Sequence, residues 1–145
     1  MTIKEVQDEI VDEFDFLSSW EEKYKYIIDL GKDMAPYPDE FRDEDHKVKG
    51  CQSQVWMHSG LDEDRIRFRG DSDAFIVKGL IALLMRIYDN QTPEEILSTP
   101  LDFTDRIGLS TSLSPTRSNG LVAMIKKIKG YALAYQALKK GQFPD

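Results

Sequence analysis

Cys51 is the residue best suited to nucleophilic chemistry in this 145-residue chain, and it is the only cysteine. It follows Gly50 in the polar stretch "KVKGCQSQVW", residues 47–56. A free cysteine that serves only packing is expected among apolar neighbours, and these neighbours are polar. We therefore expect Cys51 to act as a reactive thiol presented by a loop, with a small buried hydrophobe as the alternative.

The charges around Cys51 have opposite effects on its thiol. If the segment is extended, Lys47 and Lys49 lie on the same side of the chain as Cys51 and favour the thiolate. The acids at 43–45 precede them, and they raise the pKa of the thiol if they fold back. The sequence leaves the direction of the shift open.

Arg117 stands where a helix start would disfavour a cation. The stretch "SPTR" predicts Ser114 as N-cap, which places Arg117 in the first turn, where the helix dipole disfavours a positive charge by roughly 0.3–1 kcal/mol. A thiolate, a persulfide or an acid of another protein would offset this cost, and a solvated side chain is the alternative. Gly120, inside the same helix, predicts that another backbone passes close by.

The remaining residue types suggest no other catalytic or metal site. His58 is expected on the exposed face of a strand and His46 in a solvated acidic loop. One cysteine and two scattered histidines lack the paired spacing of zinc or iron–sulfur sites, so we expect no metal of the chain's own. A Cys–His catalytic pair gains no support from the spacing.

Composition narrows the class of protein. Nineteen Lys and Arg against 26 Asp and Glu give a net charge of −7 without a basic block, which argues against nucleic-acid binding. The longest apolar run, "AFIVKGLIALLM", is interrupted by Lys78 and too short to cross a membrane. With one cysteine and no export-like start, we expect a cytoplasmic protein.

Patterning predicts one α+β domain over residues 1–145. Capping-box spacing starts a helix at Thr2 that runs toward Phe16, and a second begins at Ser19 and is expected to end at Gly31. Alternation over 53–59 and 65–70 predicts an antiparallel hairpin.

Three more helices are expected after the hairpin. The first is capped by Asp71, Ser72 or Asp73, carries a buried stripe and runs to about Tyr88. A short one begins at Thr92. A long one runs from Ser114 to a stop at Gly141, with these positions inward: Leu121, Met124, Ile125, Ile128, Ala132, Tyr135 and Leu138. The fold class is therefore a small antiparallel sheet with helices packed on one face.

Four stretches together resemble the SufE family of sulfur-acceptor proteins: "WEEKYKYIIDLG", "GCQSQVW", "GDSDAFIVKGL" and "LSPTRSNGL". They fall in that family's order and spacing, and the likeness runs from about Trp20 to Lys139. The resemblance implies a fold like that of the iron–sulfur scaffold IscU.

The resemblance also implies a function. Cys51 would accept sulfur as a persulfide from a SufS-type, pyridoxal-phosphate-dependent cysteine desulfurase, stimulate that enzyme, and pass the sulfur to a Suf-type assembly scaffold. The protein would be an accessory carrier without a cofactor of its own. Arg117 would stabilise charge at Cys51 or dock the desulfurase, and Gly50 and Gln52 would shape the loop that presents Cys51. Weaker candidates are Asp73, as a cap or loop support, and Lys78, as an interface or solvated lysine.

Alternatives from other classes stay open. The main one is a regulatory binding module of a desulfurase in which Cys51 is inert, and a cysteine hydrolase ranks last. A homodimer is also open. For the carrier, we expect Cys51 to be tucked against apolar residues and to swing out on Gly50 when the desulfurase binds.

Overall fold

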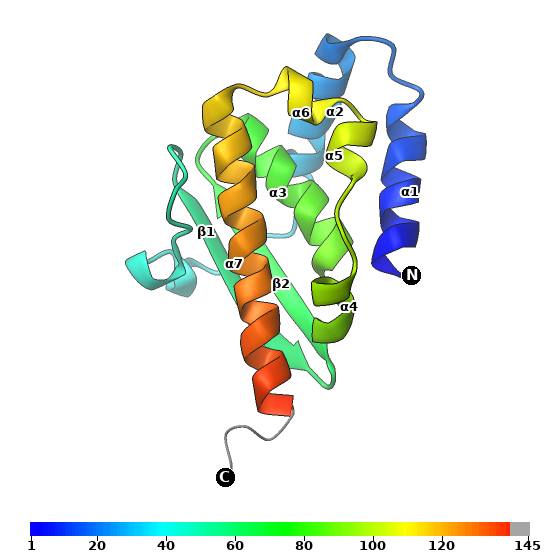
Figure 1. Cartoon of the computed structure of the whole chain (residues 1–145). Helices are drawn as coiled ribbons and strands as arrows, with labels where there is room; N and C mark the ends of the chain where they lie inside the picture. The colour runs from blue at the N-terminus through cyan, green and yellow to red at the C-terminus, as the bar shows by residue number, and fades with distance from the viewer. Residues whose placement is uncertain (140–145) are drawn as a thin grey trace.

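The computed structural model describes residues 1–139, and the predicted helix stop at Gly141 lies outside this part. Two strands follow two helices and two short 3₁₀ turns, and five more helices complete the described part of the chain (Figure 1). The elements are α1 (Ile3–Phe14), α2 (Trp20–Lys32), η1 (Asp39–Phe41), η2 (Glu44–His46), β1 (Val55–Asp62), β2 (Arg65–Ser72), α3 (Phe75–Tyr88), α4 (Pro93–Ser98), α5 (Phe103–Arg106), α6 (Leu109–Ser112) and α7 (Pro115–Lys139). The predicted α+β class is confirmed.

Local capping chemistry fixes most helix starts. A side-chain oxygen accepts a backbone N–H three residues on at the four predicted caps Thr2, Ser19, Thr92 and Ser114. The Thr2 cap is a complete capping box, since Glu5 also accepts the N–H of Thr2 at 2.9 Å. These bonds satisfy N–H groups that have no partner inside the helix.

The start of α3 differs from the prediction. Its N-cap is Ala74, whose side chain offers no oxygen, so the predicted caps Asp71, Ser72 and Asp73 were wrong. Ser72 Oγ accepts the N–H of Ala74 at 3.2 Å, and the Asp73 carboxylate bonds to another segment. A local turn engages Ser72, and tertiary contacts engage Asp71 and Asp73, before the helix begins.

The hairpin is longer than predicted. Strands β1 and β2 pair antiparallel from Val55 opposite Ser72 to Asp62 opposite Arg65, around a two-residue turn in which Glu63 has a φ of 59°. The predicted alternation is confirmed, since four side chains face the core and are at most 1% exposed: Val55, Met57, Ile66 and Phe68.

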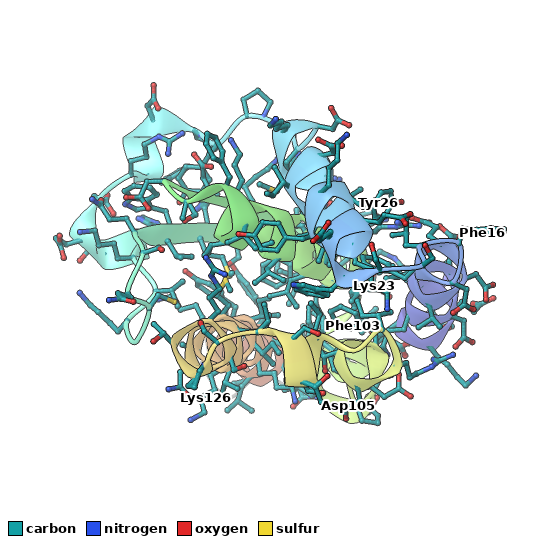
Figure 2. The ribbon with its side chains drawn as sticks, turned by 90° about the horizontal axis from the view of Figure 1, so that it is seen from above. Phe16, Lys23, Tyr26, Phe103, Asp105 and Lys126 are labelled. Carbon is teal, nitrogen blue, oxygen red and sulfur yellow. The ribbon has the colours of Figure 1, made fainter. Side chains whose placement is uncertain are left out.

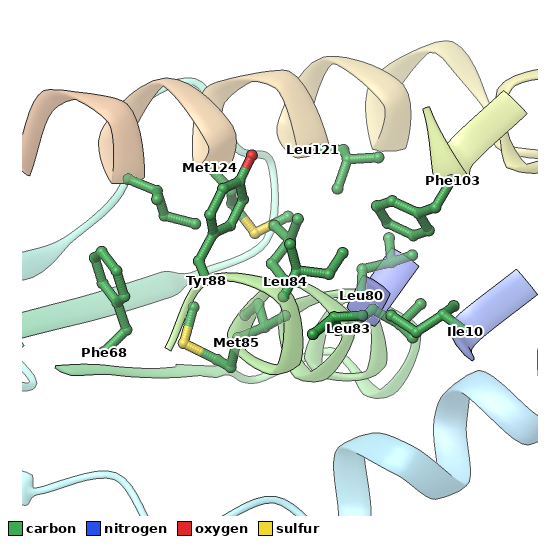
Figure 3. Close-up of a cluster of buried hydrophobic side chains, with 14 of the residues drawn as sticks. Ile10, Phe68, Leu80, Leu83, Leu84, Met85, Tyr88, Phe103, Leu121 and Met124 are labelled. Atoms are coloured by element: carbon green, nitrogen blue, oxygen red, sulfur yellow. The ribbon is translucent and has the colours of Figure 1, made fainter. Parts of the chain in front are cut away.

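Helix α3 lies at the centre of the core, packed against α2, β2 and α7. Its predicted inward stripe is confirmed, and all five side chains are buried: Ile76, Leu80, Leu83, Leu84 and Ile87. Figure 3 shows Tyr88 between α3 and α7, beside Met124, with its hydroxyl directed toward α7. The buried apolar side chains form one cluster.

Two glycines bring α2 and α3 into backbone contact. A Cβ at Gly79 would overlap the carbonyl oxygen of Ile27, and a Cβ at Gly31 would lie 2.7 Å from the Gly79 nitrogen. Gly31 was predicted to end α2, but the helix continues to Lys32. The glycine is there because a side chain would not fit between the helices.

Side-chain bonds hold α2 against α1 and the α5 segment. The Tyr26 hydroxyl donates to Glu13 of α1 at 2.5 Å, and Lys23 Nζ donates to the Ile107 carbonyl at 3.3 Å. Figure 2 shows Lys23 on the side of α2 toward Phe103. Helix α2 is thus a fixed wall next to the start of α7.

Helix α7 packs along the sheet, where Tyr131 donates to the carbonyl of Met57 at 3.3 Å. Four predicted inward positions are buried: Leu121, Met124, Ile128 and Ala132. Leu138 was wrongly placed inward, since it is 50% exposed at the last described turn. Within residues 1–139, no helix combines the length and apolar character needed to cross a membrane.

Candidate functional site

Cys51 lies at the tip of a short loop, residues 49–54, between η2 and β1. The base of the loop is closed by a backbone hydrogen bond from the Val48 N–H to the Val55 carbonyl at 2.8 Å. Gly50 has a φ of +93°, a conformation that other residues rarely adopt, and its Cα faces Ala123 of α7. The loop therefore turns at Gly50 and lays Cys51 against the first turns of α7.

The Cys51 thiol is half-buried beside a cavity of about 150 Å³. Its Sγ donates a weak hydrogen bond to the Gly120 carbonyl, at 3.6 Å. The cavity has walls from the Cys51 loop, from α3 and from the start of α7: Gln52, Ser53, Val77, Leu80, Ser114, Thr116, Arg117, Gly120 and Met124. The thiol thus lies in a pocket with apolar and polar sides.

This environment favours the protonated thiol. Burial raises the pKa of Cys51 above its ordinary value. The Gly120 carbonyl acts in the same direction, because it accepts the S–H proton and would repel a thiolate. The direction left open by the sequence is therefore upward.

The neighbouring charges are engaged with one another. Lys47 Nζ lies 3.0 Å and Lys49 Nζ 3.4 Å from carboxylate oxygens of Glu44. One carboxylate thus engages both lysines at the loop entrance, and burial is the cause of the raised pKa of Cys51.

Arg117 lines the Cys51 cavity from the first turn of α7. Its guanidinium carbon lies 5.9 Å from the centroid of the Tyr24 ring of α2, close enough for a cation–π contact. None of the ion pairs formed within residues 1–139 includes Arg117. The contact with the aromatic face partly offsets the cost of placing a cation in the first turn of a helix. The guanidinium stays available to an anion in the cavity.

Gly120 has a different neighbour from the one predicted. A Cβ at this position would lie 3.6 Å from Cys51 Sγ, and no backbone outside α7 comes within 4 Å of it. The expectation of a close backbone was wrong: the glycine faces the thiol and leaves room next to it.

The other predicted site residues divide into two groups. Gln52 is exposed and lines the cavity, and Asp73 Oδ1 accepts the N–H of Gln54 at 3.1 Å, where the loop leaves for β1. Lys78 is turned away from the cavity and pairs with Asp71 at 3.3 Å. The structure thus gathers Cys51, Gln52 and Arg117 around one cavity, with Gly50 next to Cys51 in the loop and Asp73 at the loop base; their functional roles remain predictions.

Some cavity residues were not identified as site residues from the sequence. Leu80 and Met124, which line the cavity, were recognised only as core positions, and Tyr24, which contacts Arg117, only as part of a helix face. No sequence signal distinguishes a core residue that lines a cavity from one that fills it, because the difference depends on how three segments meet.

Neither histidine lines the Cys51 cavity. His58 stacks on Phe41 with the ring centroids 3.7 Å apart, and His46 is 5.7 Å from His58. Burial lowers the pKa of His58, and the neighbouring His46 adds to the effect. Across residues 1–139, His, Cys, Asp and Glu side chains do not gather in a group of three that could hold a metal ion.

Comparison with known proteins identifies the family. The family described as "SufE: Fe-S metabolism associated domain" matches residues 8–132. The chain belongs to the SufE family. An uncharacterized SufE-like protein of Rhizobium meliloti is 43% identical over 130 residues, covering 86% of this chain and 93% of that protein. One from Rhizobium etli is 42% identical over 127 residues, covering 84% and 86%.

The fold is shared with a solved structure. The solution structure of a hypothetical protein from Thermus thermophilus has a TM-score of 0.74 and covers 92% of this chain and 96% of its own, at 22% identity. At this identity the likeness concerns the fold. The family places this chain in iron–sulfur metabolism.

Proposed function

We propose that this SufE-family chain is a persulfide carrier, an accessory protein and not a stand-alone enzyme. It takes sulfane sulfur from a SufS-type cysteine desulfurase onto Cys51, stimulates that enzyme, and passes the sulfur to iron–sulfur cluster assembly. The observation that carries the proposal is the single thiol, held by a loop beside a cavity with an arginine in its wall. Pyridoxal phosphate belongs to the desulfurase, and the carrier needs no cofactor of its own.

The transfer is a thiol exchange that balances without an oxidant. The Cys51 thiolate attacks the terminal sulfur of the donor persulfide, a new S–S bond forms at Cys51 Sγ, and the donor S–S bond breaks. The electron pair leaves on the donor cysteine as its thiolate. Cys51 gives its proton to solvent or to a base of the donor before the attack.

The resting site protects the thiol and accommodates its product. The chain has no second cysteine, so a Cys51 persulfide cannot close an intramolecular disulfide. The cavity next to Sγ has room for the added sulfur, and the Arg117 guanidinium in its wall can stabilise a persulfide anion. Such chemistry requires a reducing compartment, and we place the protein in the cytoplasm.

The same resting site is poorly arranged for attack. A half-buried thiol that donates to a carbonyl is neither ionised nor open to a second protein. We infer that the loop swings out on Gly50 when the desulfurase docks, which removes Cys51 from the Gly120 carbonyl. A thiol that is alkylated in the free protein as fast as a small-molecule thiol would contradict this motion.

Intact-mass analysis tests the function. The protein is incubated with a SufS-type desulfurase, pyridoxal phosphate and cysteine, beside a Cys51→Ser variant. We expect a reductant-sensitive gain of one sulfur atom on the wild type alone, together with faster desulfurase turnover. If Cys51→Ser stimulates the desulfurase as well as the wild type does, the chain is a regulatory module with an inert cysteine.

A further inference from the structure

Asp71, on β2, is a buried carboxylate that the sulfur chemistry does not use; it is 7% exposed. Its Oδ2 lies 2.5 Å from Arg42 Nη1, and its Oδ1 lies 3.3 Å from Lys78 Nζ and accepts the Ser72 N–H at 2.8 Å. A buried carboxylate is tolerated only with such partners. Two cations from distant parts of the chain therefore meet on one anion.

Arg42 ties this anion to aromatic side chains. Its guanidinium carbon lies 5.3 Å from the centroid of the Tyr37 ring and 5.4 Å from that of Trp56. Trp56 stands directly opposite Asp71 in the β1–β2 ladder. The start of β1 is thus held twice: backbone pairing joins Trp56 to Asp71, and the Arg42 guanidinium contacts both the Trp56 ring and the Asp71 carboxylate.

The cluster adjoins the Cys51 loop on its exit side. The loop ends at Gln54, whose N–H donates to Asp73, two residues after Asp71, and whose carbonyl accepts the Asp73 N–H at 3.4 Å. Lys78 follows Val77, which lines the Cys51 cavity. The Asp71 carboxylate therefore connects α3 to the 3₁₀ segment, and the loop exit is attached to the same stretch of chain two residues farther on, through Asp73.

We propose that Arg42, Asp71 and Lys78 are positioning residues for Cys51, which hold the exit of its loop at a fixed place relative to the α3 wall of the cavity. The effect on the thiol is independent of any partner, whereas the effect on sulfur transfer rests on the proposed function. Breaking the cluster loosens the loop exit, so Cys51 leaves the cavity more often. Its position relative to a docked donor then varies more.

The test compares Asp71→Asn with the control Glu13→Gln. Glu13 also pairs with an arginine, Arg86, and that pair joins α1 to α3 away from the Cys51 loop. The first readout is the rate of Cys51 alkylation by iodoacetamide over a pH range, which separates exposure of the thiol from its pKa. The second is desulfurase turnover against carrier concentration, which separates KM from kcat.

For Asp71→Asn we expect alkylation about fivefold faster than in the wild type, since residues in one network are coupled. We also expect a raised KM for the carrier at little changed kcat. Glu13→Gln should melt at a lower temperature but react at the wild-type rate. Equal alkylation of Asp71→Asn and Glu13→Gln would overturn the positioning role.

Two further outcomes distinguish failure of the positioning role from failure of the carrier function. If Asp71→Asn does not fold, Lys78→Met removes one cation from the half-exposed side, and a wild-type alkylation rate in that variant contradicts the proposal. If the desulfurase loads no sulfur on the wild type, the carrier function fails, and the alkylation rates still decide whether the cluster positions Cys51.

Discussion

Two pairs of glycines lie at two junctions of this molecule and have opposite roles: one pair allows close packing, and the other leaves space. At the α2–α3 crossing, Gly31 and Gly79 let backbone meet backbone, and a Cβ on either would meet main-chain atoms at 2.7 Å or less. At the Cys51 loop, a Cβ on Gly50 or Gly120 would meet only a methyl group at 3.4 Å or a sulfur atom at 3.6 Å.

The difference separates packing from function. The first pair has no spare room, because the space is filled by the partner helix. The second pair leaves space around a reactive atom that a packed core would fill. Loss of stability should therefore follow substitutions at the crossing, and changes in thiol chemistry should follow substitutions at the loop.

The largest effect is expected for Gly79→Ala at the α2–α3 crossing. The new methyl group overlaps the Ile27 carbonyl oxygen, so the helices must separate. We expect urea denaturation to show that the free energy of unfolding falls by about 3 kcal/mol. Gly130→Ala is the matched control, since nothing lies within 4 Å of that helical position. Similar unfolding curves for the two variants would contradict the close crossing.

An intermediate effect is expected for Gly50→Ala. Its φ of +93° becomes unfavourable for a residue with a Cβ, at a cost of about 1–2 kcal/mol. Gly108→Ala is the control, since Gly108 has a φ of +81° and open space around it. Both variants should lose similar stability in denaturation, and only Gly50→Ala should alter the alkylation rate of Cys51. A change in both would show that general loosening exposes the thiol.

A smaller effect on stability is expected for Gly120→Ala. Alanine favours the helix by up to ~1 kcal/mol over glycine, and its Cβ would make an ordinary contact with Cys51 Sγ. The variant should therefore be as stable as the wild type or slightly more so. Because the methyl group occupies space next to the thiol, mass analysis should show slower persulfide loading. Gly130→Ala should gain stability and load normally; unchanged loading in Gly120→Ala would mean that the cavity is not used.

The smallest effect concerns pH. Burial raises the pKa of Cys51 in the fold, so the protonated thiol stabilises the native state, and this contribution is complete below the pKa of the unfolded chain. It is lost as the pH rises through the folded-state pKa. Between neutral pH and about pH 10, the free energy of unfolding of the wild type should thus fall relative to that of Cys51→Ser. A difference that does not vary with pH would indicate an open thiol.

Much of the fold was predictable because its determinants are local. Capping oxygens at Ser19, Thr92 and Ser114 mark helix starts, and two-residue alternation marks the hairpin. The errors have a different origin. Gly31 was read as a helix stop, and Leu138 as a core residue, because crossings and helix ends are decided by neighbours distant in sequence.

The candidate site shows the same division. A cysteine among polar residues and an arginine in a first helical turn could be recognised from single positions. Their approach within one cavity, 66 residues apart in the chain, could not, nor could the contact of Arg117 with Tyr24. The acid at Asp71 was read as a helix cap because its two cations come from other elements.

The size of the cavity beside Cys51 affects how the thiol is oxidised. A space of about 150 Å³ can hold a benzene-sized molecule, and so admits one sulfur atom or a peroxide molecule, but not the tripeptide glutathione. With the loop withdrawn, we therefore expect small oxidants to react with the sulfur faster than the bulky thiols of the cell do, and we expect this preference to weaken when the loop opens.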